Sequence, residues 1–298
     1  MAFPLAGRPR VERRLAVMTV TDSFSGKHVE LSVSVVVYHP DLEKLRDTLR
    51  SLSNAIAMVR LSRPGMAAHL YLIDNGGFGG DSVATAMLAE AGVSCTMLAG
   101  HGNVGYGRGH NIAIAAASSR YHLVLNPDID LDRDALMRAL HFIDGHPHLG
   151  LLAPYVGDND RAVQFLCRRY PTVLDLFVRG FLPTRLRVPF SSRLTHYEMR
   201  DVINDHDIVW DPPIVSGCFM LFRTEVLKKL GGFDPRYFLY FEDYDLSLRT
   251  HDVARVAYVP SVRVIHHGGG ASRKGFAHIR MFAASAFKFY NRFGWRLW

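Results

Sequence analysis

The sequence predicts an α/β protein built on a parallel, doubly wound sheet. Short β-branched runs alternate with helical stretches through the first half of the 298-residue chain, a pattern typical of strands joined by crossover helices. Polar clusters stand directly after the second, third and fourth of these runs. Because such sheets bind ligands at the carboxyl ends of their strands, we expect a binding cleft at that edge.

The strands of the first half are predicted from short apolar runs bounded by turn-forming residues. They occupy residues 31–38, 69–73, 93–98, 121–125 and 149–153. Apolar residues three or four positions apart predict the helices between the strands. These helices occupy residues 42–57, 81–91, 111–118 and 133–142, and the glycine-rich residues 100–109 precede the third of them.

The second half is less regular. Residues 154–211 mix charges, prolines and aromatics, and no element is predicted there. A strand at 214–223 contains Gly217, and the helix that follows at 224–230 stops at a glycine pair. The aromatic and acidic residues 237–245 open a helix to about 251. A strand at 255–259 and a loop at 266–270 follow.

An amphipathic helix is predicted at residues 276–293. One side carries Phe276, Ile279, Ala283, Phe287, Tyr290 and Phe293, and the other carries Arg280, Lys288, Arg292 and Arg296. A helix of this composition either packs on the domain core or rests on the inner leaflet of a membrane.

Composition narrows the class of protein. The net charge of +7 attracts phosphates, but no nucleic-acid-binding module is recognisable, so no nucleic-acid partner is expected. Residues 1–28 are basic and lack the apolar core of a signal peptide. No apolar run is long enough to span a membrane. Both features predict a cytoplasmic location. The isolated Cys95, Cys167 and Cys218 are expected to be buried and inert.

Two acidic clusters carry the chemistry. Residues 126–130, at the end of a strand, offer Asp128 for a divalent cation that bridges a diphosphate, or they form a polar turn. Residues 241–245 offer one carboxylate as a general base, or they stabilise a helix N-terminus. The aromatic residues around this second cluster lower the local polarity, which raises a carboxyl pKa.

Three further motifs accompany these clusters. Asp74 and Asn75 follow a strand and suit a pyrimidine imide, with an Asn-Gly turn as the alternative. The glycines of residues 102–111 precede a helix and make an anion site, but they lack the spacing of the dinucleotide fingerprint. The pair His266 and His267 precedes three glycines and suits a metal or phosphate, with a flexible loop as the alternative.

The order of these motifs resembles the family 2 inverting glycosyltransferases of the GT-A fold. It is most similar to their rhamnosyltransferase branch, which builds bacterial lipopolysaccharide and related cell-wall glycans. The resemblance runs from residue 31 to about 272. It is carried by the stretches SVVVYHP, LIDNGG, GNVGYGRGHN, LVLNPDIDL, VSGCFMLFR, LGGFDPRYFLYFEDYDLSLR and VIHHGGGAS. It implies a Rossmann-like mixed sheet flanked by helices, with an acceptor-side C-terminal portion.

The resemblance also implies roles for residues at matching positions. Asp243 matches the catalytic base, with Glu242 and Gly217 on the acceptor side. The donor side is implied to comprise Tyr38, Asp74, Asn75, Gly105, Arg108 and Asn126. The implied ligands of Mg²⁺ or Mn²⁺ are Asp128, Asp130 and His267, with His266 as the alternative histidine. Asn126 stands where many relatives carry Asp, so either Asp130 or His267 completes the metal shell or the metal binds more weakly.

The expected organisation has three parts. Residues 1–28 form a basic extension, 29–275 a catalytic domain with a nucleotide-binding half (29–153) and an acceptor-binding half (154–275), and 276–298 the amphipathic helix. The expected reaction moves L-rhamnose from dTDP-L-rhamnose to a saccharide or polyprenyl-linked glycan at the inner face of the plasma membrane. The alternatives are a UDP-hexose or UDP-galactofuranose donor, or a non-catalytic sugar-nucleotide-binding protein.

Overall fold

The computed structural model describes residues 16–19, 29–79, 82–268 and 275–298. Most of the predicted N-terminal extension, the predicted helix start at 81, and residues 269–274 after His267 therefore lie outside the described residues. Within the extension, the described residues Ala16–Thr19 form strand β1, which pairs with β4 at one edge of the sheet. This part of the predicted extension therefore belongs to the sheet.

The described residues form one 10-stranded mixed sheet in the order β1-β4-β3-β2-β5-β9-β7-β10-β6, with β8 pairing β10. The strands after β1 are β2 (Val29–Val37), β3 (Ala67–Asp74), β4 (Ser94–Ala99), β5 (Tyr121–Leu125), β6 (Ile129–Leu131), β7 (Leu149–Gly157), β8 (Val209–Trp210), β9 (Phe219–Arg223) and β10 (Arg255–His266). Strand β9 runs antiparallel to both β5 and β7. The parallel sheet predicted from the alternation was therefore wrong, because periodicity does not reveal strand direction, and the mixed sheet implied by the resemblance is present.

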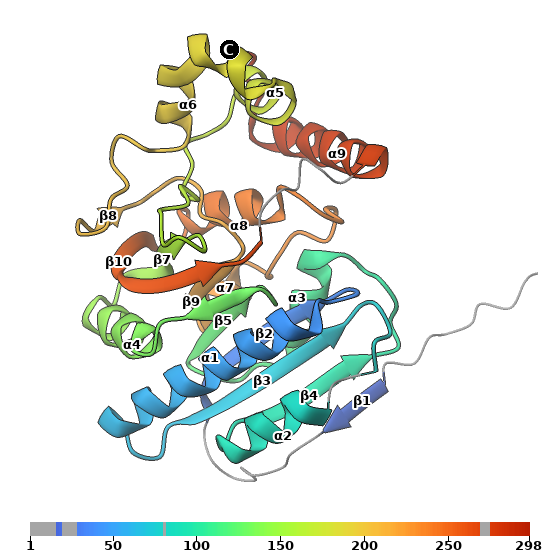
Figure 1. The fold of residues 1–298 in the computed structure, drawn as a ribbon, viewed down its shortest axis with the longest axis vertical. Coiled ribbons are helices and arrows are strands. Elements are labelled where there is room, and N and C mark those ends of the chain that lie inside the picture. Colours follow the sequence, from blue (N-terminus) through green and yellow to red (C-terminus); the bar gives the residue numbers. More distant parts are fainter. Residues whose placement is uncertain (1–15, 20–28, 80–81, 269–274) are drawn as a thin grey trace, which may run out of the picture.

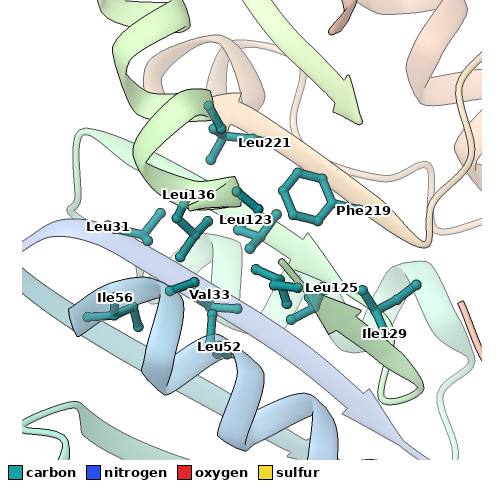
Figure 2. Packing of buried hydrophobic residues seen from close by; sticks show 14 of the residues in the cluster. Leu31, Val33, Leu52, Ile56, Leu123, Leu125, Ile129, Leu136, Phe219 and Leu221 are labelled. Carbon is teal, nitrogen blue, oxygen red and sulfur yellow. The ribbon is translucent and has the colours of Figure 1, made fainter. Parts of the chain in front are cut away.

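Helices cover both faces of the sheet (Figure 1). They are α1 (Leu42–Ser62), α2 (Ser82–Glu90), α3 (Tyr106–Ala116), α4 (Ala135–Gly145), α5 (Val173–Phe181), α6 (Ser191–Tyr197), α7 (Thr224–Lys229), α8 (Glu242–Thr250) and α9 (Gly275–Phe293), with a 3₁₀ helix at Thr184–Phe190. Helices α1, α2 and α4 contribute to one core cluster and α3, α7 and α8 to another. Successive side chains of β5 point to opposite faces of the sheet. Leu123 and Leu125 therefore belong to the first cluster and Val124 to the second. Figure 2 shows Leu52, Ile56 and Leu136 meeting the strands on the first face.

A third cluster lies at the end of the molecule that carries α5, α6 and α9 (Figure 1). Its buried members are Leu176, Tyr197, Tyr237, Phe241, Phe289 and Tyr290. The helix predicted at 276–293 is confirmed, but its predicted apolar face was wrong in part. Phe282, Phe289 and Tyr290 pack inward, whereas Phe276, Ile279 and Phe287 are exposed. Because nearly every side of this helix carries an aromatic residue, spacing alone does not show which face is buried.

Several other boundaries differ from the prediction. Helix α3 begins at Tyr106, five residues before the predicted start. Gly107 and Gly109 were interpreted as part of a loop but lie inside the helix, where a Cβ on Gly107 would meet Phe233 Cβ at 2.8 Å. Strand β9 begins at Phe219 rather than 214, and β10 continues past its predicted end at 259 to His266, the first residue of the predicted loop. The segment 154–211, where nothing was predicted, contains α5, α6, β8 and the 3₁₀ helix. The three cysteines are buried, and burial raises each thiol pKa to about 12.

Candidate active site

Acidic side chains from distant parts of the chain meet around residues 217–218. Asp243 lies in the first turn of α8, and its Oδ2 accepts a hydrogen bond from the Gly217 N–H at 3.0 Å. The next residue, Cys218, accepts a hydrogen bond through its carbonyl from the Asn126 N–H at 2.9 Å. The segment that carries Asp128 is therefore joined to the segment that carries Asp243 through one dipeptide.

Tyr106 lies between these groups. Its hydroxyl donates to the Gly217 carbonyl at 2.6 Å. Burial raises the pKa of Tyr106 well above its ordinary value, and the nearby negative charges of Asp243, Glu242 and Asp128 raise it further. Sequence reasoning missed this tyrosine, because it stands among the glycines that were interpreted as an anion site.

The two carboxyl groups of α8 have unusual surroundings. Burial raises the pKa of Asp243, although hydrogen bonds from the Gly217 and Tyr244 N–H groups oppose the rise. Burial and the charge of Asp243 raise the pKa of Glu242 to about 8. The Oε2 atom of Glu242 is buried without a hydrogen-bond partner among the described residues. A carboxyl group with such a pKa accepts a proton more readily than an exposed one.

The backbone before α8 is strained. Tyr240 and Phe241 have φ values of 72° and 66°, in the left-handed region that non-glycine residues rarely adopt. Phe241 is held there by ring contacts with Phe282 and Phe289 of α9, with centroids 5.1 and 5.2 Å apart. The aromatic residues around the acidic cluster therefore fix the entry to α8, while the polar residues of the first turn face the site.

A second acidic group follows β5. His266 Nε2 lies 3.5 Å from Asp128 Oδ1, and His267 Nε2 lies 2.8 Å from Asp130 Oδ2. Burial raises the pKa of Asp128, but the nearby imidazole of His266 and the charge of Lys44 outweigh this effect, so the pKa is lowered. A Cβ on Gly268 would lie 2.3 Å from Asp128 Oδ2, so a glycine is required at this position. The structure thus assigns the two histidines to different carboxylates.

The oxygen atoms of this group suit a divalent cation. Asn126 Oδ1, Asp128 Oδ1 and Asp130 Oδ1 are all buried without a hydrogen-bond partner among the described residues. Within the same residues, no set of three or more His, Cys, Asp or Glu side chains is arranged as a metal cluster. The unpartnered oxygens suit Mg²⁺ or Mn²⁺, which take oxygen ligands from proteins and from substrate phosphates.

The expected donor side lies at the ends of β2 and β3. Asp74 Oδ1 accepts from the Gly76 and Gly77 N–H groups at 2.9 and 2.7 Å, and its Oδ2 accepts from Gly79 at 3.2 Å. Asp74 therefore shapes the loop after β3. Tyr38, at the end of β2, is 56 % exposed and free to contact a ligand.

Asn75 connects this loop to the glycine-rich segment. Its Nδ2 donates to the Gly105 carbonyl at 3.0 Å, and its Oδ1 lies 2.8 Å from His101 Nε2. Gly105 has φ +89°, and a Cβ there would lie 2.2 Å from the Phe238 carbonyl oxygen. The exposed Arg108 donates from Nε to the Pro235 carbonyl at 2.5 Å. These contacts fasten the donor-side loop to the segment that precedes α8.

Comparison with known proteins bears on this arrangement. The family model described as Glycosyl transferase family 2 matches residues 32–231. The chain is 27 % identical over 202 residues to rhamnosyltransferase WbbL of Escherichia coli, covering 64 % of this chain and 72 % of that protein. It is 28 % identical over 250 residues to N-acetylglucosaminyl-diphospho-decaprenol L-rhamnosyltransferase of Mycobacterium tuberculosis, covering 80 % and 76 %.

Solved structures share the fold. The TarS 1-349 fragment of S. aureus, in complex with UDP, matches with a TM-score of 0.53 and 16 % identity over 88 % of this chain. GalNAc-T7, with UDP, GalNAc and Mn²⁺, matches with a TM-score of 0.56 and 15 % identity over 81 %. This chain spans 66 % of the TarS fragment and 43 % of GalNAc-T7. The GT-A-type α/β fold that the sequence resemblance implied is confirmed.

Proposed function

The chain belongs to glycosyl transferase family 2, and from this membership we propose that it moves L-rhamnose from dTDP-L-rhamnose to a saccharide or polyprenyl-linked glycan acceptor. The names of the two curated relatives support the sugar, since both are rhamnosyltransferases. The observation that carries the catalytic assignment is the half-buried Asp243 carboxylate, held by the Gly217 N–H and joined through residues 217–218 to the Asp128 segment.

In the proposed reaction, Asp243 is the general base. The acceptor hydroxyl lies against the Asp243 carboxylate and attacks the anomeric carbon from the face opposite the nucleoside diphosphate. A bond forms between the acceptor oxygen and the anomeric carbon, and the bond from that carbon to the phosphate oxygen breaks. The proton passes to Asp243, and the configuration inverts. The raised pKa of Asp243 suits this transfer, because it brings the base closer to neutral pH.

The donor occupies the ends of β2, β3 and β5 in this proposal. Tyr38, Asp74 and Asn75 bind the nucleoside, and Gly105 and Arg108 lie along the donor. Asn126, Asp128 and Asp130 would hold Mg²⁺ or Mn²⁺ together with His267, and their unpartnered oxygens support this assignment. When bound, such a cation offsets the negative charge of the departing diphosphate.

A polyprenyl-linked acceptor places the enzyme at the inner face of the plasma membrane. Two other donors, a UDP-hexose and UDP-galactofuranose, remain candidates, because sugar selectivity depends on loop geometry rather than on the carboxylates. A non-catalytic sugar-nucleotide-binding protein is disfavoured by the buried carboxylates of α8, which are costly to keep in a fold that performs no proton transfer.

A donor screen tests the proposal. The purified protein is incubated with dTDP-L-rhamnose, UDP-glucose, UDP-galactofuranose or GDP-mannose and Mg²⁺ or Mn²⁺, and thermal shift and release of nucleoside diphosphate are measured. Of the four donors, we expect only dTDP-L-rhamnose to give both the thermal shift and the release of nucleoside diphosphate. A response confined to a UDP-sugar would reject the donor but keep the reaction class. Binding without release of nucleoside diphosphate, even with added acceptor, would favour the non-catalytic alternative.

A further inference from the structure

The end of the molecule that carries α5 and the C-terminus (Figure 1) is built from segments that bear large, exposed apolar side chains. Those that belong to α5, the 3₁₀ helix and the C-terminal tail are Phe177, Phe181, Leu186, Val188, Leu297 and Trp298. Their exposed fractions range from 49 % to 83 %. We call this set the α5–tail surface. Apolar side chains gathered in this way on a water-facing surface mark an interaction site.

The segments that carry these residues are bound to one another. The Val173 N–H donates to the Arg296 carbonyl at 2.8 Å, and the Leu174 N–H donates to the Leu297 carbonyl at 3.1 Å. The rings of Phe177 and Phe181 are stacked, with centroids 6.0 Å apart. The 3₁₀ helix follows α5 directly and is tied to its end by Arg187, which donates to the Leu182 carbonyl at 2.7 Å. The surface is therefore composite and held in place.

The charge around this surface has one sign. Residues 176–197 contain four arginines and no Asp or Glu, and the chain contains no Asp or Glu after Asp252. The nearest acidic side chains are occupied, since Asp175 pairs with Arg193 and Glu198 pairs with Arg179. In the part of the chain that the structure describes, Arg185 and Arg187 of the 3₁₀ helix have no carboxylate within ion-pair distance. Exposed apolar rings with unneutralised cations match the chemistry of an anionic lipid surface.

The surface is one layer of side chains away from the candidate base. The third core cluster joins Leu176 of α5 and Phe289 of α9 to Phe241, which directly precedes Glu242 and Asp243. A lipid surface on the outer side of this cluster would therefore lie next to the acceptor side of the site. Among the described helices, none is both long and apolar enough to cross a membrane.

We propose that the α5–tail surface docks onto the anionic face of a lipid bilayer and thereby presents the site to a lipid-linked acceptor. This inference rests on the proposed function for its acceptor. A second copy of this chain is a poorer occupant, because a two-fold contact would place the same basic residues against themselves. The sequence allowed either core packing or membrane contact for residues 276–298, whereas the α5–tail surface also includes α5 and the 3₁₀ helix.

Vesicle co-flotation of the full chain tests the proposal. The vesicles are phosphatidylcholine alone or phosphatidylcholine with 30 % phosphatidylglycerol as a working mixture (about the order of anionic content at which basic segments bind). We expect binding only to the anionic vesicles. Replacing Arg185 with Ser should weaken binding about fivefold, because one charge is removed. The matched control replaces the exposed Lys228 and Lys229 of α7 with Ser and should bind as the wild type does.

The apolar part is tested by Leu186→Ser, with Leu61→Ser on α1 as its control. Leu61 is 74 % exposed and Leu186 59 %, so both variants should fold, and only Leu186→Ser should reduce flotation. The proposal would be overturned if Leu186→Ser and Leu61→Ser floated equally. It would also be overturned if the Lys228/Lys229 control lost as much flotation as the arginine variant. A dimer in light scattering that Leu186→Ser dissociates would assign the surface to a second copy instead.

The membrane inference and the proposed function fail separately. Release of nucleoside diphosphate from dTDP-L-rhamnose with a water-soluble acceptor needs no vesicle. If that activity is present and vesicle binding is absent, the reaction stands and the surface assignment falls. If vesicle binding depends on Leu186 but no donor is turned over, the surface stands and the function falls.

Discussion

The substitution Asp243→Asn separates catalysis from folding. In the native protein, the two carboxylate oxygens of Asp243 accept hydrogen bonds from the Gly217 and Tyr244 N–H groups, each at 3.0 Å. An asparagine has nearly the same shape but only one acceptor oxygen, so one of these N–H groups loses its partner. That loss costs about 1–3 kcal/mol, and the removal of a buried negative charge offsets part of it. We therefore expect a folded protein whose Tm changes by no more than about 5 °C.

The chemical effect should be much larger. Without a base, turnover should fall by at least about 10²-fold, while the affinity for the donor stays near that of the wild type. The assay measures kcat by release of nucleoside diphosphate and donor binding by calorimetry. In the wild type, kcat should decline as the pH falls through the raised pKa of Asp243, because a protonated carboxyl cannot accept the proton. The exposed Asp252→Asn serves as the control and should retain full turnover. Turnover in Asp243→Asn within about threefold of the wild type would refute the assignment.

Three further predictions follow from the geometry. Gly105→Ala should destabilise the fold by at least about 3 kcal/mol, because its φ of +89° is strained for alanine and its Cβ would meet the Phe238 carbonyl oxygen. As a control, Gly145→Ala should change the free energy of unfolding by less than about 1 kcal/mol, because its Cβ meets nothing within 4 Å. Urea unfolding measures both values. Glu242→Gln should flatten the fall of Tm between about pH 5 and pH 8. The carboxyl pKa is raised from 4.5 to about 8, so the stability that is fully present below the lower value is lost by the time the pH has passed the higher one. Asp128→Ala should weaken calorimetric binding of Mn²⁺ with nucleoside diphosphate by at least about tenfold, whereas the exposed Asp160→Ala should not.

Each of these predictions has an opposing result. Equal stability of Gly105→Ala and Gly145→Ala would mean that the loop before α3 moves away from Phe238 at little cost. A Tm that falls as steeply in Glu242→Gln as in the wild type would place the pH dependence on other groups. Unchanged Mn²⁺ binding in Asp128→Ala would show that the unpartnered oxygens after β5 serve another purpose than metal binding.

Local patterns predicted most elements of the nucleotide-binding half. The helix over α1 and the strands β2, β3, β4, β5 and β7 were placed within a few residues, because each combines a strong apolar period with a clear turn residue at its end. Helix α3 was misplaced at its start, since glycines that usually interrupt a helix are here required by the close approach of Phe233 and Val36. Residues 154–211 were not predicted, because their helices are short and are held by contacts with α9 and the C-terminal tail rather than by local propensity.

The sequence alone determined the fold class, the two acidic clusters and their order along the chain, because these depend on residue type and local spacing. The tertiary structure alone decided that β9 enters the sheet antiparallel, that residues 217–218 join the two clusters, and that Tyr106 and His266 lie against Gly217 and Asp128. It also decided that α5 and the tail share one exposed surface. The physical reason is the same in each case: the partners are separated by tens to more than a hundred residues, and contacts at that range arise from packing, which no local period encodes.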